Sequence, residues 1–491
     1  MKTHSLYSLL KIFGTVMMAL FTACTVGPTF QPPTPDMPSR WTESAENVSA
    51  RADAKISAWW TLFQDPVLNS LITRAITSNQ DLRLAETRIR EARALRRMTA
   101  SKSLPAVDAT GSYTYSRTGD TPSSLTTTQD LFQLQANQDL YQAGFDVNWE
   151  IDIFGGTRRA TEAADASVAA SVEDGRDVLV SLVAEVSRNY LDLRGIQQRL
   201  VLAKENISLQ EKTFDMVRKR FQSGFGDELA VVQAETQHAI ARSQIPPLES
   251  AASQAMHQLA LLLGLMPDAL VPELTGKKPI PATPPQVPVI LPSELLRQRP
   301  DIRRAERQLA AATAEIGVAT AELFPRFSLA AFIGLESTDL SQLVTSGSRF
   351  WTVGPQVKWS LFDGGKARAG IEASNSRRDR AQIFYEKTVL TALVETENAL
   401  VAFSREQQTR QSLKTAVIAG QRALSISKTQ YVLGFVDFLN VLQIELALYQ
   451  SQDQLVQSEQ RLSLDMVALF KALGGGWEIP KEKNQSLPSE K

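Results

Sequence analysis

The pattern of apolar and polar positions changes along the chain, from long helical stretches to short alternating runs and back. In four runs of about ten residues, apolar side chains occupy every second position, which is the pattern of a strand with one apolar face. These runs lie near 107–115, 145–151, 327–335 and 351–359. The stretches around them are rich in Ala, Leu, Gln, Glu and Arg, which favour helices. The pattern predicts two strand pairs set between helices.

Helices are predicted on both sides of each strand pair. A helix over 66–102 precedes the first pair, and a helix over 292–323, with a fresh start at Pro300-Asp301, precedes the second. Longer helices follow the pairs, over 157–222 and 366–433, and no proline interrupts either one. At 1.5 Å per residue each would be about 100 Å long. Helices of that length need partners of similar length, as in a coiled coil or a helical barrel.

A short turn sends each long helix back on itself. The turn sequences are Gly224-Phe225-Gly226-Asp227 and Gly434-Phe435-Val436-Asp437. Glycine accepts the positive φ of a helix C-terminus, and aspartate caps the helix that follows. The return helices end near Gly264 and Gly474, and Pro246-Pro247 must kink or break the first of them. Each strand pair is therefore predicted to lead into a helical hairpin.

The two halves of the chain repeat one another. At an offset of 210 residues, seven of the fifteen positions in 221–235 are identical in 431–445, where ordinary composition gives about one. The same offset aligns Trp149 with Trp359, whereas upstream the offset is 220. The first half thus holds about ten additional residues, and Thr118–Gln138 is predicted to be a longer loop. So long a period indicates duplication of a whole structural unit.

The start of the chain has the pattern of a secretion signal. A lysine-containing stretch is followed by apolar Ile12–Phe21 and by small residues before Cys24. A cysteine at the cleavage position resembles a bacterial lipoprotein signal and predicts a lipid on Cys24, although Phe21 stands where leucine is usual. The alternative is an ordinary signal peptide with an incidental cysteine. The proline-rich run that follows predicts an extended tether.

These elements divide the chain in order. We expect a signal peptide (1–23), a lipidated extended tether (24–58), a first repeat (59–275) with a β-hairpin at 105–153 and a helical hairpin at 157–264, a second repeat (276–477) with a β-hairpin at 325–362 and a helical hairpin at 366–474, and a polar tail (478–491).

Composition limits the classes of function. Lys and Arg number 52 against 53 Asp and Glu, so no excess charge points to nucleic acid. Three histidines and one cysteine make a His/Cys metal site unexpected. No P-loop, G-x-S-x-G or H-E-x-x-H motif occurs. We therefore expect neither an enzyme nor a cofactor beyond the lipid, and energy for any transport would come from a partner.

Four strands of bilayer length are too few to close a barrel, since the smallest membrane barrels have eight. An open strand edge in lipid leaves backbone groups unpaired at several kcal/mol each. Several chains would therefore share one barrel: two would give eight strands and three would give twelve, and the larger number suits a water-filled lumen. The alternative is a soluble hairpin half buried on a helical layer.

Four motifs carry a family resemblance. They are Cys24-Thr25-Val26-Gly27-Pro28, Trp59-Trp60 with Phe63 and Asp65-Pro66, Asn79-Gln80-Asp81-Leu82-Arg83-Leu84-Ala85, and Leu291-Pro292-Ser293-Glu294-Leu295-Leu296 continuing through Arg299-Pro300-Asp301-Ile302-Arg303 to Ala305-Glu306. The chain from Cys24 to about Trp477 resembles the outer-membrane efflux proteins, the TolC-like family, and in particular the NodT-type lipoprotein branch of tripartite RND-type efflux pumps.

The resemblance implies a mainly α protein with a membrane β-barrel. It implies a homotrimer with a twelve-stranded barrel, continued by a long periplasmic α-helical barrel, in the cell outer membrane. Its partners would be a periplasmic adaptor protein and an inner-membrane pump of the RND type. The function implied is an exit duct for drugs or other small molecules, and in this architecture the pump chooses the substrate.

The resemblance also assigns roles to the two turns. Gly224, Phe225, Gly434 and Phe435 would contact the adaptor, and the alternative is a tight, packed turn. Asp437 and Asp227 would line a periplasmic gate, where three-fold symmetry gathers carboxylates that favour cations. The alternative for the two aspartates is helix capping.

Two rival functions remain. A type I secretion duct for polypeptides would have the same architecture, and the lipoprotein start argues against it. A periplasmic helical scaffold lipoprotein, or an adaptor, would also carry long helical hairpins. Adaptors have small β-domains and lack duplicated pairs of membrane-length strands.

Overall fold

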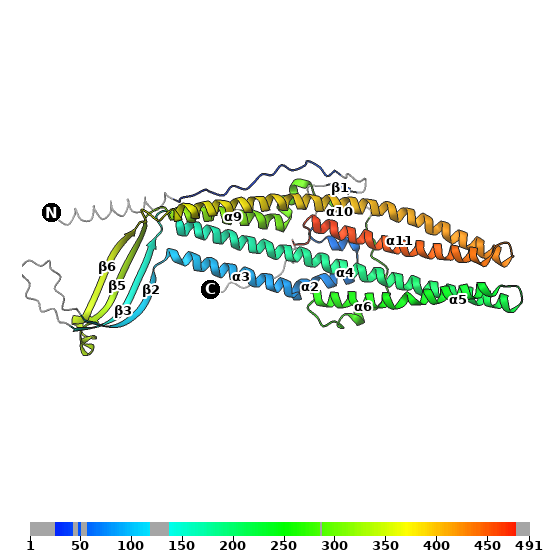
Figure 1. Cartoon of the computed structure of the whole chain (residues 1–491), viewed down its shortest axis with the longest axis horizontal. Helices are drawn as coiled ribbons and strands as arrows, with labels where there is room; N and C mark the ends of the chain where they lie inside the picture. Colours follow the sequence, from blue (N-terminus) through cyan, green and yellow to red (C-terminus); the bar gives the residue numbers. More distant parts are fainter. Residues whose placement is uncertain (1–24, 43–47, 51–55, 118–136, 285–286, 478–491) are drawn as a thin grey trace, which may run out of the picture. The chain divides into compact units, whose positions relative to one another are not determined.

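The computed structural model describes residues 25–42, 48–50, 56–117, 137–284 and 287–477. The predicted signal peptide, Cys24, the tail after 477 and nearly all of the predicted loop 118–138 lie outside the described residues. Contacts divide the chain into two compact units (Figure 1). Unit 1 is built from the N-terminal part up to Pro33, from Arg90–Ala170 and from Glu306–Phe384, and unit 2 from the remainder.

Unit 1 contains one antiparallel sheet with the strand order β2-β3-β5-β6 (Figure 1). The strands are β2 (Ala106–Arg117), β3 (Asn137–Ile151), β5 (Arg326–Ser337) and β6 (Arg349–Lys358). Each repeat contributes one hairpin, and β3 joins β5 from the pairing of Tyr141 with Ser337 to that of Ile151 with Phe327. Strands β2 and β6 are the two outer strands of this sheet.

The strand register places most of the large apolar side chains of the four strands on one face. Phe145 lies opposite Ala109 of β2 and Ile333 of β5, and Ile333 lies opposite Trp351 of β6. Phe145, Ile333 and Trp351 are each more than half exposed. The alternate positions form a more polar face. An exposed apolar face that spans four strands suits contact with lipid rather than with water.

Helices of 13 to 67 residues accompany the strands. The main helices are α2 (Pro66–Ser78), α3 (Gln80–Ala100), α4 (Gly156–Gln222), α5 (Glu228–Ser243), α6 (Ile245–Leu262), α9 (Pro300–Ala321), α10 (Lys366–Val432) and α11 (Phe438–Ala472). The two longest, α4 and α10, each run for 67 residues without a break, as the sequence predicts. No helix in the described part of the chain has an apolar window long enough to cross a bilayer.

The predicted helix over 66–102 is wrong as a single element, because it divides at Asn79. The Asn79 side chain accepts hydrogen bonds from the backbone N–H groups of Asp81 and Leu82, at 2.9 and 3.1 Å. It thereby caps α3 in the way asparagine caps helices generally. Its amide also donates to the carbonyl of Leu262 at the end of α6. A tertiary contact therefore fixes the break.

Prolines set other breaks. The predicted helix over 292–323 begins with two short turns, η3 (Pro292–Glu294) and α8 (Leu295–Gln298), and the long helix starts only at Pro300. The return helix of the first repeat divides at Gln244, next to the Pro246-Pro247 pair, as predicted. The second return helix, α11, is continuous.

Unit 2 holds the main hydrophobic core. The 3-10 turn η1 (Trp59–Phe63) supplies Trp59, which is buried and stacks on Phe470 of α11 with ring centroids 5.3 Å apart. Trp41 donates from its indole N–H to the carbonyl of Ile290, next to the short parallel pair β1 (Val48–Ala50) and β4 (Val287–Val289). The Trp59-Trp60 motif thus belongs to the core.

A second core of unit 2 contains a buried ion pair. Glu445 of α11 has no exposed side-chain surface and lies 2.7 Å from Nζ of Lys428 on α10. Thr213 of α4 donates its hydroxyl to the same carboxylate at 3.1 Å. Burying a charge is costly unless it is paired and hydrogen-bonded. Glu235, the counterpart of Glu445 in the first repeat, is exposed, so the two hairpins are not equivalent here.

Replacing Lys428 should therefore destabilise the protein strongly. Lys428→Met leaves the Glu445 carboxylate buried without its cation, at a cost of about 3–5 kcal/mol. We expect a clear fall in the midpoint of thermal unfolding in detergent. The double variant Lys428→Met, Glu445→Leu should recover most of the loss. A single variant as stable as the wild type would show that the ion pair does not matter.

Candidate functional site

The two turns of the helical hairpins, 223–227 and 433–437, are called the tips here, and both lie in unit 2. Gly224 and Gly434 have φ values of +80° and +83°. The N–H of Phe225 donates to the carbonyl of Arg220 at 3.0 Å, and that of Phe435 to Gln430 at 2.9 Å. This arrangement satisfies the last carbonyl groups of a helix. An added Cβ would meet nothing within 4 Å at either glycine, so the backbone conformation rather than space requires them.

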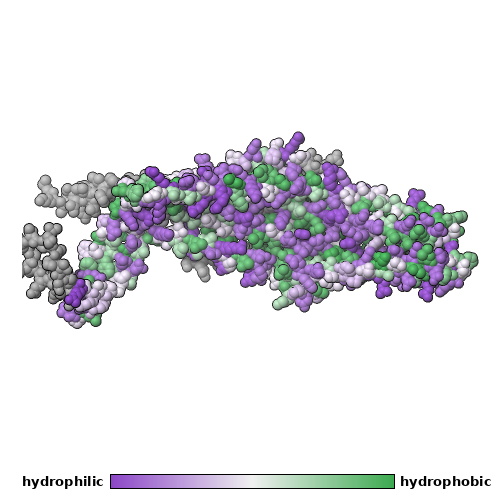
Figure 2. Space-filling view, in the orientation of Figure 1, coloured by the Kyte–Doolittle hydropathy of each residue, from purple (hydrophilic) through white to green (hydrophobic). Residues whose placement is uncertain are grey.

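The two tip phenylalanines point away from the chain. Phe225 is 78% exposed and Phe435 is 77% exposed. Figure 2 shows apolar residues among polar ones where the helical hairpins of unit 2 end. The turns are tight, but the rings do not pack within the chain as the alternative reading of the sequence required. Exposed aromatic side chains are typical of a contact surface.

The two tip aspartates differ in what their side chains do. Asp227 accepts a hydrogen bond from the N–H of Leu229 at 3.2 Å and so caps α5, as predicted. The matching prediction for Asp437 is wrong, because its side chain makes no capping bond to α11. The φ of Asp437 is −74°, against −106° for Asp227, so the two backbones enter their helices differently. Asp437 keeps an exposed carboxylate that is not used as a cap.

One arginine ties the first tip to the last turn of α10. Arg220, near the end of α4, donates from Nε to the carbonyl of Phe225 at 3.1 Å and from Nη1 to the carbonyl of Tyr431 at 3.0 Å. Its guanidinium lies 4.9 Å from the centre of the Tyr431 ring. Its counterpart in the second repeat is Gln430. The arginine is therefore present in only one of the two repeats.

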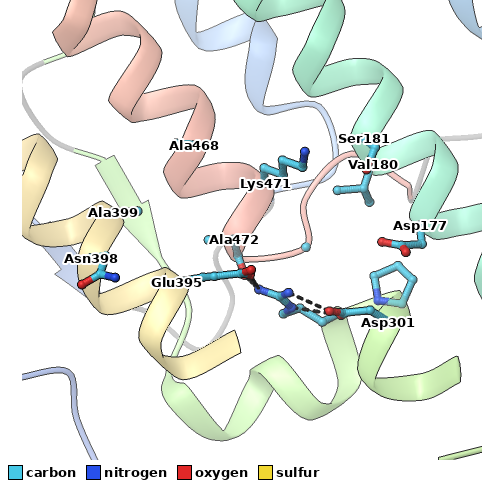
Figure 3. Close-up of a pocket in the computed structure, with 13 residues that line it drawn as sticks. Asp177, Val180, Ser181, Asp301, Glu395, Asn398, Ala399, Ala468, Lys471 and Ala472 are labelled. Atoms are coloured by element: carbon cyan, nitrogen blue, oxygen red, sulfur yellow. Dashed lines mark hydrogen bonds and ion pairs between the residues drawn. The ribbon is translucent and has the colours of Figure 1, made fainter. Parts of the chain in front are cut away.

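Unit 2 also contains a cleft of about 630 Å³, where α4, α9, α10 and α11 meet (Figure 3). Arg299 donates to both carboxylate oxygens of Asp301, at 3.0 and 2.7 Å, and to the carbonyl of Ala472 at 2.8 Å. It also lies 2.8 Å from the Glu395 carboxylate. The charged groups of the Arg299-Pro300-Asp301 motif thus compensate one another.

The same cleft shifts the pKa of one carboxyl group, that of Asp177. Burial raises the pKa of the Asp177 carboxyl above its ordinary value, and the nearby Arg304 guanidinium opposes the shift. Arg304 also pairs with Asp174 and Asp177. These ion pairs hold the start of α9 against α4, which is a structural role for the motif. Within the described residues, no group of three or more His, Cys, Asp or Glu side chains could hold a metal ion.

The remaining predicted site residue, Cys24, lies outside the described residues. Thr25, the next residue in the chain, is described and lies against Gly155 at the start of α4.

The sequence model of the family described as outer membrane efflux protein matches residues 71–265 and 291–475 of this chain. These two segments fall one in each repeat. Nodulation protein T of Rhizobium leguminosarum bv. viciae is 31% identical over 472 residues, which cover 96% of this chain and 94% of the relative. The cation efflux system protein CusC of Escherichia coli O6:H1 is 30% identical over 474 residues, covering 94% and 98%.

A solved structure of the outer-membrane channel OprN has the same fold. Its TM-score is 0.86 at 36% identity, and the match covers 92% of this chain and all of that one. The match of the family model to both repeats, together with these relatives, identifies the chain: it belongs to the outer membrane efflux protein family.

Proposed function

We propose that three copies of this chain form the exit duct of a tripartite efflux pump in the outer membrane. The duct exports drugs or other small molecules, and an RND-type inner-membrane pump and a periplasmic adaptor complete the assembly. Each copy supplies four strands to a twelve-stranded barrel and two helical hairpins to a periplasmic helical barrel. A lipid on Cys24 adds a second attachment to the membrane. The pump supplies the energy and chooses the substrate.

One observation carries this proposal: the sheet of unit 1 has an exposed apolar face and two outer strands, β2 and β6. Backbone groups on those edges have no partner in lipid unless another strand pairs with them. Further copies of the chain provide such strands, since β6 of one copy can continue into β2 of the next. Three copies give a barrel wide enough for a water-filled lumen.

The duplication indicates which side chains meet between copies. Within the chain, Phe154 of the first repeat stacks on Phe324 of the second, with ring centroids 4.6 Å apart. The 220 offset makes Leu104 the counterpart of Phe324, and the 210 offset makes Gly364 that of Phe154. The aromatic residue of the second turn is Phe362, two residues before Gly364; Phe362 and Leu104 are 91% and 66% exposed. We infer that Phe362 of one copy packs on Leu104 of its neighbour, in the way Phe154 packs on Phe324.

The two repeats keep the same local geometry, which supports that inference. The indole N–H of Trp149 donates to the carbonyl of Ser103 at 2.9 Å. The indole N–H of Trp359 donates to the carbonyl of Leu323 at 3.0 Å. Trp149 and Trp359 are related by the 210 offset, and the acceptors Ser103 and Leu323 by the 220 offset. In both repeats, therefore, the strand pair is joined to the helix before it by the same hydrogen bond.

At the other end of the hairpins, the tips would meet the adaptor through Gly224, Phe225, Gly434 and Phe435. The exposure of both phenylalanine rings supports this role. Asp437 and Asp227 would form two rings of carboxylates at the periplasmic gate. Asp437 is the better gate residue, because Asp227 is used as a helix cap.

Extraction separates a membrane-spanning duct from a scaffold held only by lipid. A Cys24→Ala variant whose signal is still cleaved should remain with outer membranes after washing at high pH, because its strands stay in the bilayer. Release of this variant into the soluble fraction would contradict the proposed duct.

Cross-linking tests the contact between copies. With Cys24 blocked by lipid, Phe362→Cys with Leu104→Cys should yield covalent dimers and trimers after treatment with a short bismaleimide. The matched pair Phe154→Cys with Phe324→Cys should react within one chain and leave its mass unchanged on a denaturing gel. If the first pair gives only monomers while the second reacts, the inferred contact is wrong.

Conductance tests the gate. Asp437→Ala should raise the single-channel conductance in planar bilayers, because shorter side chains widen the gate, and should lower the preference for cations, because a ring of negative charge is removed. Asp227→Ala serves as the control, with a smaller change in conductance and a loss of about 1 kcal/mol from the lost cap. Unchanged conductance and selectivity in Asp437→Ala would rule out the gate role.

A further inference from the structure

The first described residues of the chain, Thr25-Val26-Gly27, form a segment that we call the strap. It lies in unit 1, at the foot of the sheet, where β3 turns into α4 and α9 leads into β5. The N–H of Val26 donates to the carbonyl of Phe154 at 3.2 Å. Thr25 lies against Gly155, where an added Cβ would come within 3.2 Å of three Thr25 atoms. The strap is therefore in close main-chain contact with the turn between β3 and α4.

A buried arginine holds the strap from the other side. Arg159 of α4 is only 5% exposed. Its Nε donates to the carbonyl of Val26 and its Nη2 to the carbonyl of Gly27, each at 3.1 Å. Its Nη1 lies 2.8 Å from the Glu162 carboxylate. A buried guanidinium is stable only when its donors find acceptors, and here two of those acceptors belong to the strap.

Two glycines make room for the strap. Gly27 has a φ of +88°, and a Cβ on it would lie 2.4 Å from the Cα of Gly317 on α9. A Cβ on Gly317 would lie 2.7 Å from Cγ of Arg159 and 2.9 Å from the carbonyl oxygen of Val26. Contacts this short to backbone atoms exclude any larger residue unless the strap moves.

The seat formed by Arg159, Gly155 and Gly317 is not repeated by the duplication. The counterpart of Arg159 in the second repeat is Ala369, and the counterpart of Gly317 in the first repeat is Arg97. At the equivalent position, Ala369 has no guanidinium to hold a strap, and the Arg97 side chain would occupy the space of one. The seat is therefore a special feature of the junction between the two repeats within one chain.

We propose that this seat fixes the point where the N-terminus meets the outer membrane. The lipid anchor is then held rigidly beside the turn between β3 and α4, rather than at the end of a flexible tether, and we call an anchor held in this way the post. The proposal rests on the lipid attachment at Cys24, which is one peptide bond before the seated Thr25. The seat binds the strap of the same chain, and the lipid that precedes the strap enters the membrane. The distance that the lipid can move from the seat then does not depend on the residues after Gly27.

Hydrogen exchange tests the seat, whether or not Cys24 carries a lipid. In the purified protein, the peptide that contains Val26 should exchange roughly ten-fold faster in Arg159→Gln, because its backbone acceptors lose their donors. Arg158→Gln is the matched control, since Arg158 is exposed and contacts Asp152 and Ile153 instead of the strap. Equal exchange in Arg159→Gln and the wild type would overturn the seat.

Two insertions test the role of the post. Thr-Gly-Ser-Gly placed between Cys24 and Thr25 keeps threonine after the lipidated residue and adds up to about 13 Å of reach above the seat. The same four residues placed after Pro35 lie below the seat. The readout is photo-cross-linking from a benzophenone side chain at Ile153 to the lipidated N-terminal residue, identified by mass.

The first insertion should reduce this cross-link several-fold, and the second should leave it unchanged. Equal effects of the two insertions would mean a loose tether and would overturn the proposal. A mass showing no lipid on Cys24 would overturn the post as well as the proposed lipid attachment, whereas the exchange experiment would still decide whether the seat exists.

Discussion

Unpaired backbone groups at the edges of the four-stranded sheet are the constraint on which the proposed assembly depends. Lipid offers no hydrogen bonds, so a strand edge in the bilayer must find another strand. Strands β2 and β6 are outer strands in this chain, and the apolar face between them is exposed. Copies of the chain can satisfy those edges, and the duplicated hairpins let the junction inside one chain serve as the pattern for the junction between chains.

The repeats are similar in architecture but have diverged at particular positions. Glu445 is buried with Lys428, whereas its counterpart Glu235 is exposed. Arg220 ties the first tip to the last turn of α10, and Gln430 stands at its equivalent position. The seat of the strap likewise occurs at one junction. In a ring of three copies these differences would alternate, so hairpins of the first and second type would have different roles at the gate and the adaptor.

Much of the fold could be predicted because its signals are local. Alternation of period two marked the strands, and the lack of proline marked α4 and α10. The break at Asn79 was missed because its cap depends on α6, which lies far away in sequence. The tips could be located from Gly224 and Gly434, but the different roles of Asp227 and Asp437 depend on backbone angles that identical residues do not reveal. Arg220 and Arg159 were missed because their partners are main-chain carbonyls, which carry no sequence signal.

If several copies share one barrel, native mass spectrometry of the protein released from outer membranes in mild detergent will detect them together. We expect a particle with the mass of three chains, each carrying a lipid at its N-terminus. A particle with the mass of one chain, recovered from the membrane with its strands intact, would contradict it, because the edges of β2 and β6 would then lie in lipid without a partner.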